Sequence, residues 1–197
     1  MGIFRRKKPP VEPEANVFVH LNARVRPLDR GSVYEDPLDE AFARIAPGSQ
    51  VVGGGTEFHP EKGPLSCDSD LAVVGDTEDA VPQVIEALES FGAPVGSWLT
   101  IKDGPKVPFG ITHGFALTLD GTSLPDEVYA ENDVNDLVND LVAELEGHAT
   151  LQSWWAGPQN TSLYFYGVDP DRLRSVLESA ASRSPLAQGS RVEMITD

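Results

Sequence analysis

The stretch VFVHLNARV at residues 17–25 decides the first element of the fold, because it places an apolar side chain at every odd position. The even positions hold Phe18, His20, Asn22 and Arg24. Successive side chains of a β-strand point to opposite faces, so this period of two predicts a strand with one core face and one polar face.

A helix, a hairpin, a second helix and a further strand follow this first strand. Asp36 and Pro37 are typical of a helix start, and an apolar stripe at helical spacing continues to Ile45. Residues 50–58 and 65–74 predict two strands, residues 80–91 a second amphipathic helix, and residues 97–101 a short strand. This order, βαββαβ, is that of a ferredoxin-like unit.

The same order returns after residues 102–108, a segment with one glycine and two prolines. Strands are expected at 115–119, 151–156, 161–168 and 191–195, with helices at 134–145 and from 170. The sequence therefore predicts an α+β fold of tandem duplicated ferredoxin-like units, each an antiparallel sheet with helices on one face. The expected boundaries are a disordered basic and proline-rich tail at 1–15, a first unit at 16–102, a linker at 103–108 and a second unit at 109–197.

The charge distribution argues against several kinds of partner. The formal net charge is −16, and no Lys or Arg lies between residues 107 and 171. Nucleic-acid binding depends on cations that neutralise phosphates, so we expect none here. No apolar run approaches the ~18 residues that a membrane span needs, and the basic residues at 5–8 have no apolar anchor, so we expect no stable membrane association.

A single cysteine, Cys67, suits a reducing compartment and predicts a cytoplasmic protein.

Aromatic and acidic side chains of the second unit are the first candidate site. The strand aromatics are Trp154, Trp155, Tyr164 and Tyr166, and the carboxylates of the predicted helix are Asp133, Asp136, Asp140 and Glu144. Some of the rings must lie on the open sheet face, where packing between the two sheets, or a second subunit in a homodimer, would bury them. A partner-binding groove is the other interpretation, because Tyr and Trp are enriched at interface hot spots and an acidic rim selects a basic protein or peptide. The leading hypothesis is accordingly a non-catalytic acidic binding protein that recognises a basic partner, as an inhibitor or an immunity-type factor. The same carboxylates are also typical of a helix face that simply contacts solvent.

Polar residues of the first unit give an alternative, a small-molecule-binding regulatory module that uses the sheet face or the interface between units. The residues expected to contact the ligand are His20, Asn22, Arg24, Asp68 and Asp70. Cross-strand pairing of Arg24 with a carboxylate would explain the same residues without a ligand. The sequence lacks G-x-S-x-G, H-E-x-x-H, Walker-type and C-x-x-C patterns, so we expect no catalytic residue, no metal ion and no cofactor.

Two pairs of short segments carry a resemblance to other proteins. Ser153–Pro158 and Leu163–Gly167 resemble the C-terminal part of a family of uncharacterised bacterial proteins, and Asp36–Asp39 and Gly53–Thr56 resemble its N-terminal part. The resemblance covers a small part of the chain and implies no functional residue.

Overall fold

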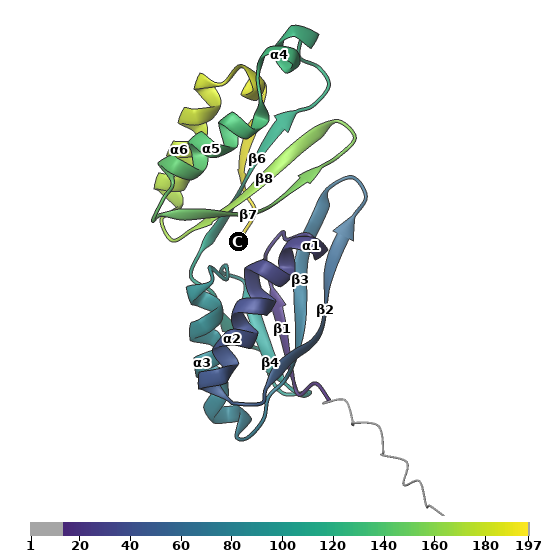
Figure 1. Ribbon diagram of the computed structural model, residues 1–197, viewed down its shortest axis with the longest axis vertical. Helices are drawn as coiled ribbons and strands as arrows, with labels where there is room; N and C mark the ends of the chain where they lie inside the picture. Colours follow the sequence, from purple (N-terminus) through teal and green to yellow (C-terminus); the bar gives the residue numbers. More distant parts are fainter. Residues whose placement is uncertain (1–13, 197) are drawn as a thin grey trace, which may run out of the picture.

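The structure is a computed structural model that describes residues 14–196. It contains two antiparallel sheets, one in each half of an elongated molecule, and the helices of each half cover one face of its sheet (Figure 1). The predicted α+β fold with two ferredoxin-like units is confirmed. Most of the tail predicted at 1–15 lies outside the described residues.

The first unit contains a five-stranded sheet in the order β2-β3-β1-β4-β5. Its strands are β1 (Val17–Leu21), β2 (Gln50–His59), β3 (Gly63–Ala72), β4 (Ser97–Ile101) and β5 (Val107–Phe109). Its helical segments are α1 (Pro27–Arg30), the π-helical turn η1 (Gly31–Glu35), α2 (Asp36–Ile45) and α3 (Thr77–Ser90). The first four strands thus have the order of a βαββαβ unit, and β5 extends the sheet at the β4 edge.

The second unit repeats this arrangement with the strand order β7-β8-β6-β9. Its strands are β6 (His113–Asp120), β7 (Ala149–Ala156), β8 (Asn160–Gly167) and β9 (Arg191–Met194). Its helical segments are α4 (Asp126–Glu131), α5 (Val134–Glu144), α6 (Pro170–Arg183) and the 3-10 turn η2 (Pro185–Ala187). Asp169 caps α6 by accepting a hydrogen bond from the Arg172 backbone N–H at 3.0 Å, which satisfies a backbone donor that has no partner within the helix.

Four elements differ from the sequence prediction. β1 ends at Leu21, whereas the alternation predicts a strand as far as Val25. The first helical run begins at Pro27, and Asp36 lies inside it, where its backbone N–H bonds to the Gly31 carbonyl in a π-helical turn. Proline in a helix lacks a donor and crowds the preceding turn, and the wider π turn lies immediately before Pro37. The predicted linker partly forms β5, and α4 was not expected.

The hydrophobic side chains form two clusters, and the division between them does not follow the boundary between the sheets. The helix side of the second sheet has its own cluster, which includes Leu117, Leu141 and Phe165. Tyr164 and Tyr166 on the opposite face of that sheet instead belong to the cluster of the first unit. The open face of the second sheet is therefore part of the first unit's core. Within residues 14–196, no helix is both long and apolar enough to cross a bilayer.

The β2–β3 hairpin contributes to this joint core by reaching the second sheet (Figure 1). Gly63 begins β3 with φ +76°, and a Cβ at this position would lie 2.6 Å from ring atoms of Trp155. Phe58 of the same hairpin meets Trp155 edge to face, with ring centroids 6.4 Å apart. The absence of a side chain at Gly63 thus permits the close approach of the hairpin to Trp155.

Replacing Gly63 by alanine tests this approach, with Gly75→Ala as the matched control. Gly75 also has a positive φ, +90°, but a Cβ there would meet no atom within 4 Å. We expect Gly75→Ala to lower the free energy of unfolding by about 1–2 kcal/mol through its backbone conformation alone. Gly63→Ala should cost about 1–3 kcal/mol more because Trp155 must move. Urea unfolding measures both values, and equal losses would contradict the contact.

Candidate functional site

The predicted aromatic site is largely enclosed by the chain itself. Tyr164, Tyr166 and Trp155 are buried, whereas Trp154 on the other face of β7 is 42% exposed. Alternation along β7 and β8 thus separates the rings as the sequence indicates, but the first unit covers the face that holds three of them. Their proposed role in partner binding requires correction, because packing between the two units leaves these three rings no free surface.

Hydrogen bonds also cross this junction between the units, although the buried Tyr164 hydroxyl has no partner among the described residues. The Tyr166 hydroxyl accepts from the Arg24 backbone N–H at 2.7 Å, and the Tyr34 hydroxyl donates to Gln152 Oε1 at 2.8 Å. Gln152 lies at a bulge of β7, and its Nε2 donates to the Gly92 carbonyl at 3.1 Å. Buried polar groups without partners are costly, so these bonds fix the register in which the two units meet.

Burial also perturbs four ionisable groups of this core. It raises the pKa of the Cys67 thiol to about 12, and it raises the pKa values of the Tyr34, Tyr164 and Tyr166 hydroxyls as well. A buried, protonated thiol is a poor nucleophile. Cys67 therefore acts as a small apolar side chain of the core.

The polar residues predicted on the first sheet are only partly brought together. His20 Nδ1 lies 2.7 Å from Asp68 Oδ1 across β1 and β3, and the His20 ring stacks on Trp98 with centroids 5.1 Å apart. Lys106 Nζ lies 3.5 Å from the centroid of the same Trp98 ring. Each of these contacts is a normal cross-strand or cation–π interaction, and His20 and Asp68 remain partly exposed on this sheet face.

Asn22 and Arg24 do not join the His20–Asp68 pair, whereas Asp70 lies two residues from Asp68 on β3, opposite Phe18. β1 ends at Leu21, and Asn22 turns away to donate from Nδ2 to the Val95 carbonyl at 3.0 Å. The Arg24 guanidinium lies 6.0 Å from the Tyr164 ring, within the junction, and makes no ion pair with any residue of the described chain. Both the five-residue ligand site and the pairing of Arg24 with a first-sheet carboxylate are therefore corrected, because the chain leaves the sheet before Asn22.

The predicted acidic helix surface is present on α5, although its residues have different surroundings. Asp133 accepts from the Asn135 backbone N–H at 2.8 Å and caps the helix. Asp133, Asp136 and Asp140 line one groove beside Leu186. Glu144 at the other end of α5 forms an ion pair with Arg183 of α6. Three of the four carboxylates thus share an exposed groove, and the fourth is engaged by a cation.

An apolar cleft that the sequence did not reveal lies next to this groove, on the helix side of the second sheet. Its volume is about 560 Å³. Most of its lining is apolar and comes from Leu119, Tyr129, Val138, Leu151, Trp154 and Leu163. Leu186 lines both the cleft and the acidic groove, so the two are adjacent. Val138, Leu151 and Leu163 read as core positions from their periodicity, and the half-exposed Trp154 is the one signal that the layer is not fully packed.

Trp154 connects the cleft to the first unit. The Arg26 guanidinium carbon lies 4.0 Å from the Trp154 ring centroid, and Arg26 Nε and Nη2 donate to Asp29 at 2.7 and 2.9 Å. Ser153, which precedes Trp154, donates to Asp29 Oδ2 at 2.6 Å and accepts from the Arg26 backbone N–H at 3.1 Å. Burial opposes ionisation of Asp29, but the hydrogen bonds from Arg26 and Ser153 outweigh it and lower the pKa of the carboxyl. One wall of the cleft is thereby held by a charged network at the junction.

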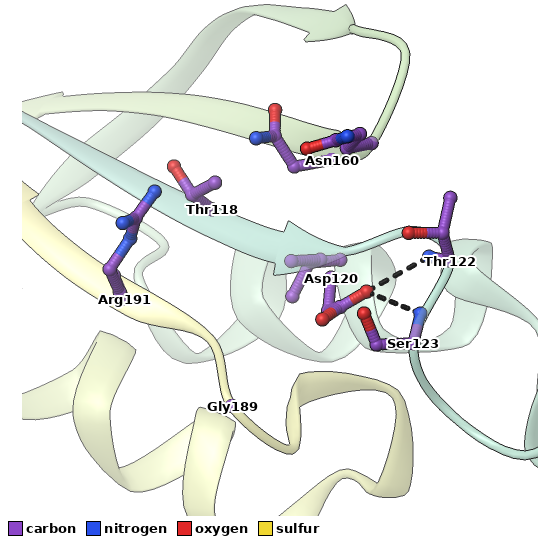
Figure 2. A pocket seen from close by; sticks show the side chains of 9 residues that line it. Thr118, Asp120, Thr122, Ser123, Asn160, Gly189 and Arg191 are labelled. Atoms are coloured by element: carbon purple, nitrogen blue, oxygen red, sulfur yellow. Dashed lines mark hydrogen bonds between the residues drawn. The ribbon is translucent and has the colours of Figure 1, made fainter.

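Asp120 marks the opposite edge of the cleft, where a polar pocket begins (Figure 2). Its Oδ1 accepts from the backbone N–H groups of Thr122 at 2.9 Å and Ser123 at 2.8 Å, and these bonds lower the pKa of the carboxyl. Arg191 and Asn160 also line this pocket, which Figure 2 shows from close by. Among the described residues, no group of three or more His, Cys, Asp or Glu side chains is placed to hold a metal ion.

The raised pKa of Cys67 predicts a loss of stability at alkaline pH. The unfolded thiol loses its proton near pH ~8.5, whereas the folded thiol keeps it until about pH 12, so the free energy of unfolding falls between these values. The expected slope is about −1.4 kcal/mol per pH unit for this one group. Denaturant unfolding between about pH 8 and 9.3 measures the approach to that slope, because tyrosines of the unfolded chain lose their protons only near pH ~10. Cys67→Ala should flatten it, and an unchanged slope in this variant would contradict the assignment.

Comparison with known proteins gives distant structural likenesses. No protein-family model and no curated protein matches the chain. The chain is similar to an unknown protein from Galdieria sulphuraria, with 14% identity, a TM-score of 0.30, and 91% of this chain and 96% of that chain covered. It is also similar to a protein described as a glycine cleavage system transcriptional repressor (10% identity, TM-score 0.31, 91% and 95% covered) and to the regulatory subunit of aspartate kinase from Thermus flavus (14% identity, TM-score 0.28, 86% and 92% covered). With TM-scores this low, the description of the fold rests on the chain's own sheets and helices.

Proposed function

We propose that this chain is a non-catalytic regulatory module that binds a small molecule in the apolar cleft of its second unit. The observation that carries the proposal is the cleft itself, a concave space of about 560 Å³ with a mainly apolar lining between α5 and the sheet. Ligand sites typically have volumes of ~300–1,000 Å³ and combine apolar walls with a few polar groups. Asp120 and Asn135 supply polar groups at the edge of this one.

We infer a regulatory role from the contact between Trp154 and Arg26 of the first unit. A ligand in the cleft would contact one part of Trp154, while Arg26 contacts the same ring from the first unit. Arg26 and Asp29 stand at the start of the helical run that carries Tyr34 into the junction. Displacement of the Trp154 ring would therefore change contacts that hold the two units together.

A blocking substitution with a matched control tests the cleft. Val138 lines the cleft from α5, and Val142, one turn later on the same helix, does not line it and is 47% exposed. We expect Val138→Trp to weaken binding of the neutral fluorescent probe N-phenyl-1-naphthylamine at least about tenfold, equivalent to ~1.4 kcal/mol, because the indole fills the cleft. Val142→Trp should leave binding unchanged.

Fluorescence titration of the probe measures both affinities, and circular dichroism establishes that each variant is folded. Val138→Phe repeats the test with a smaller ring if the tryptophan variant does not fold. Equal affinity of the wild-type chain, the Val138 variant and the Val142 variant would overturn the proposal, because the probe would then bind elsewhere.

A basic protein partner is the second candidate function, favoured by the exposed groove that Asp133, Asp136 and Asp140 share. Carboxylates in such a row attract cationic chains through a field that salt screens. We expect their joint replacement by asparagine to weaken binding of a lysine-rich peptide several-fold more than Glu40→Gln/Glu61→Gln/Glu86→Gln. The latter residues are exposed in the first unit, so the change in net charge is matched. Equal weakening, measured by fluorescence anisotropy, would show that only total charge matters.

A further inference from the structure

The surroundings of the cleft specify the charge of its ligand. We infer that the cleft selects molecules with an apolar body and a cationic head group, such as a primary amine; this inference rests on the proposed function. It specifies the chemical class of ligand that the cleft would bind.

The mouth of the cleft is bordered by carboxylates. Asp120 lies in the lining itself, fixed by the backbone N–H groups of Thr122 and Ser123. Tyr129, Val134 and Leu186 line both the cleft and an adjoining hollow, and that hollow also contains Glu131, Asp133 and Asp136. A head group that emerges from the apolar space therefore meets carboxylates along this side.

Two cations near the cleft, Arg26 and Arg183, have close acidic partners, whereas Arg191 has only a long, exposed contact with Glu193. Arg26, which covers Trp154, donates two hydrogen bonds to Asp29. Arg183, which lines the acidic groove, is paired with Glu144. Arg191 lies in the polar pocket on the far side of Asp120, with its Nε 4.0 Å from Glu193 Oε1.

None of the described residues that line the cleft is Lys or Arg. An anionic head group would thus be placed among carboxylates without a compensating cation, whereas a cationic head group would gain from each of them. The apolar lining accounts for affinity and the carboxylates account for the choice among head groups.

Three probes with the same eight-carbon chain separate these contributions, namely octylamine, octanol and octanoate, each below its micellar concentration. Competition against N-phenyl-1-naphthylamine gives their affinities. At an ionic strength of about 0.02 M we expect octylamine to bind about tenfold more tightly than octanoate, with octanol between them, and the ratio to fall to about twofold at 0.5 M. An amine that binds no better than the alcohol would overturn the inference.

Neutralising the carboxylates at the mouth of the cleft tests whether they cause the preference for a cationic head group. Glu131→Gln/Asp133→Asn/Asp136→Asn should lower the amine-to-carboxylate ratio to about twofold and leave the affinity for octanol unchanged. Asparagine retains the capping role of residue 133, so α5 should remain intact. The control Glu40→Gln/Glu61→Gln/Glu86→Gln changes the net charge equally and should preserve the ratio, and an equal drop in both variants would overturn the inference.

The Val138→Trp variant distinguishes failure of this inference from failure of the proposed function. If Val138→Trp blocks all three probes but the probes bind equally to the wild-type chain, the cleft binds ligands without selecting their charge. If Val138→Trp affects none of them, the cleft is not the binding site and both proposals fail.

Discussion

The structure depends on the packing of the second sheet's open face against the core of the first unit. Tyr164 and Tyr166 project from β8 into the hydrophobic cluster that contains β1 and the helices of the first unit. An aromatic side chain buries ~150–250 Å² in general, so separating the units would expose a large apolar area as well as the Tyr34–Gln152 hydrogen bond. The two halves are therefore one cooperative assembly despite the repeated order of their elements.

This packing makes the two units unequal. The second sheet uses its open face to join the units, while the first sheet's open face carries the His20–Asp68 pair under Trp98 and Lys106. Between the helices and the sheet, the first unit is the more tightly packed of the two. The first unit is filled by Tyr34, Leu38 and Phe42 from the long helical run, whereas the second unit has the shorter α4 and α5 and retains a cleft. A duplicated sequence pattern has thus produced one unit that is closed and one that is open.

Periodicity was sufficient to predict the βαββαβ order of the main elements in each unit and the opposite directions of Trp154 and Trp155, but not α1, α4 or β5. It did not show what covers the open face, because an alternating strand has the same pattern whether its outer face meets a partner or another part of its own chain. Asp36–Pro37 resembles a helix start, and only the backbone shows that a π turn carries the helix past it. The cleft was not predictable either, since Val138 and Leu163 have the same spacing whether their layer is tightly or loosely packed.

The position of Trp154 determines how the cleft and the junction affect each other. Its ring lines the cleft, its neighbour Ser153 hydrogen-bonds to Asp29, and Arg26 contacts both the ring and that carboxylate. A ligand that prefers one position of the ring therefore stabilises the junction geometry that accompanies it. Under the proposed function such coupling would be reciprocal, so the junction geometry would favour ligand binding by the same factor by which the ligand favours that geometry. The proposed cleft in the second unit is in this way connected to the first unit through the adjacent side chains of Trp154, Arg26 and Asp29.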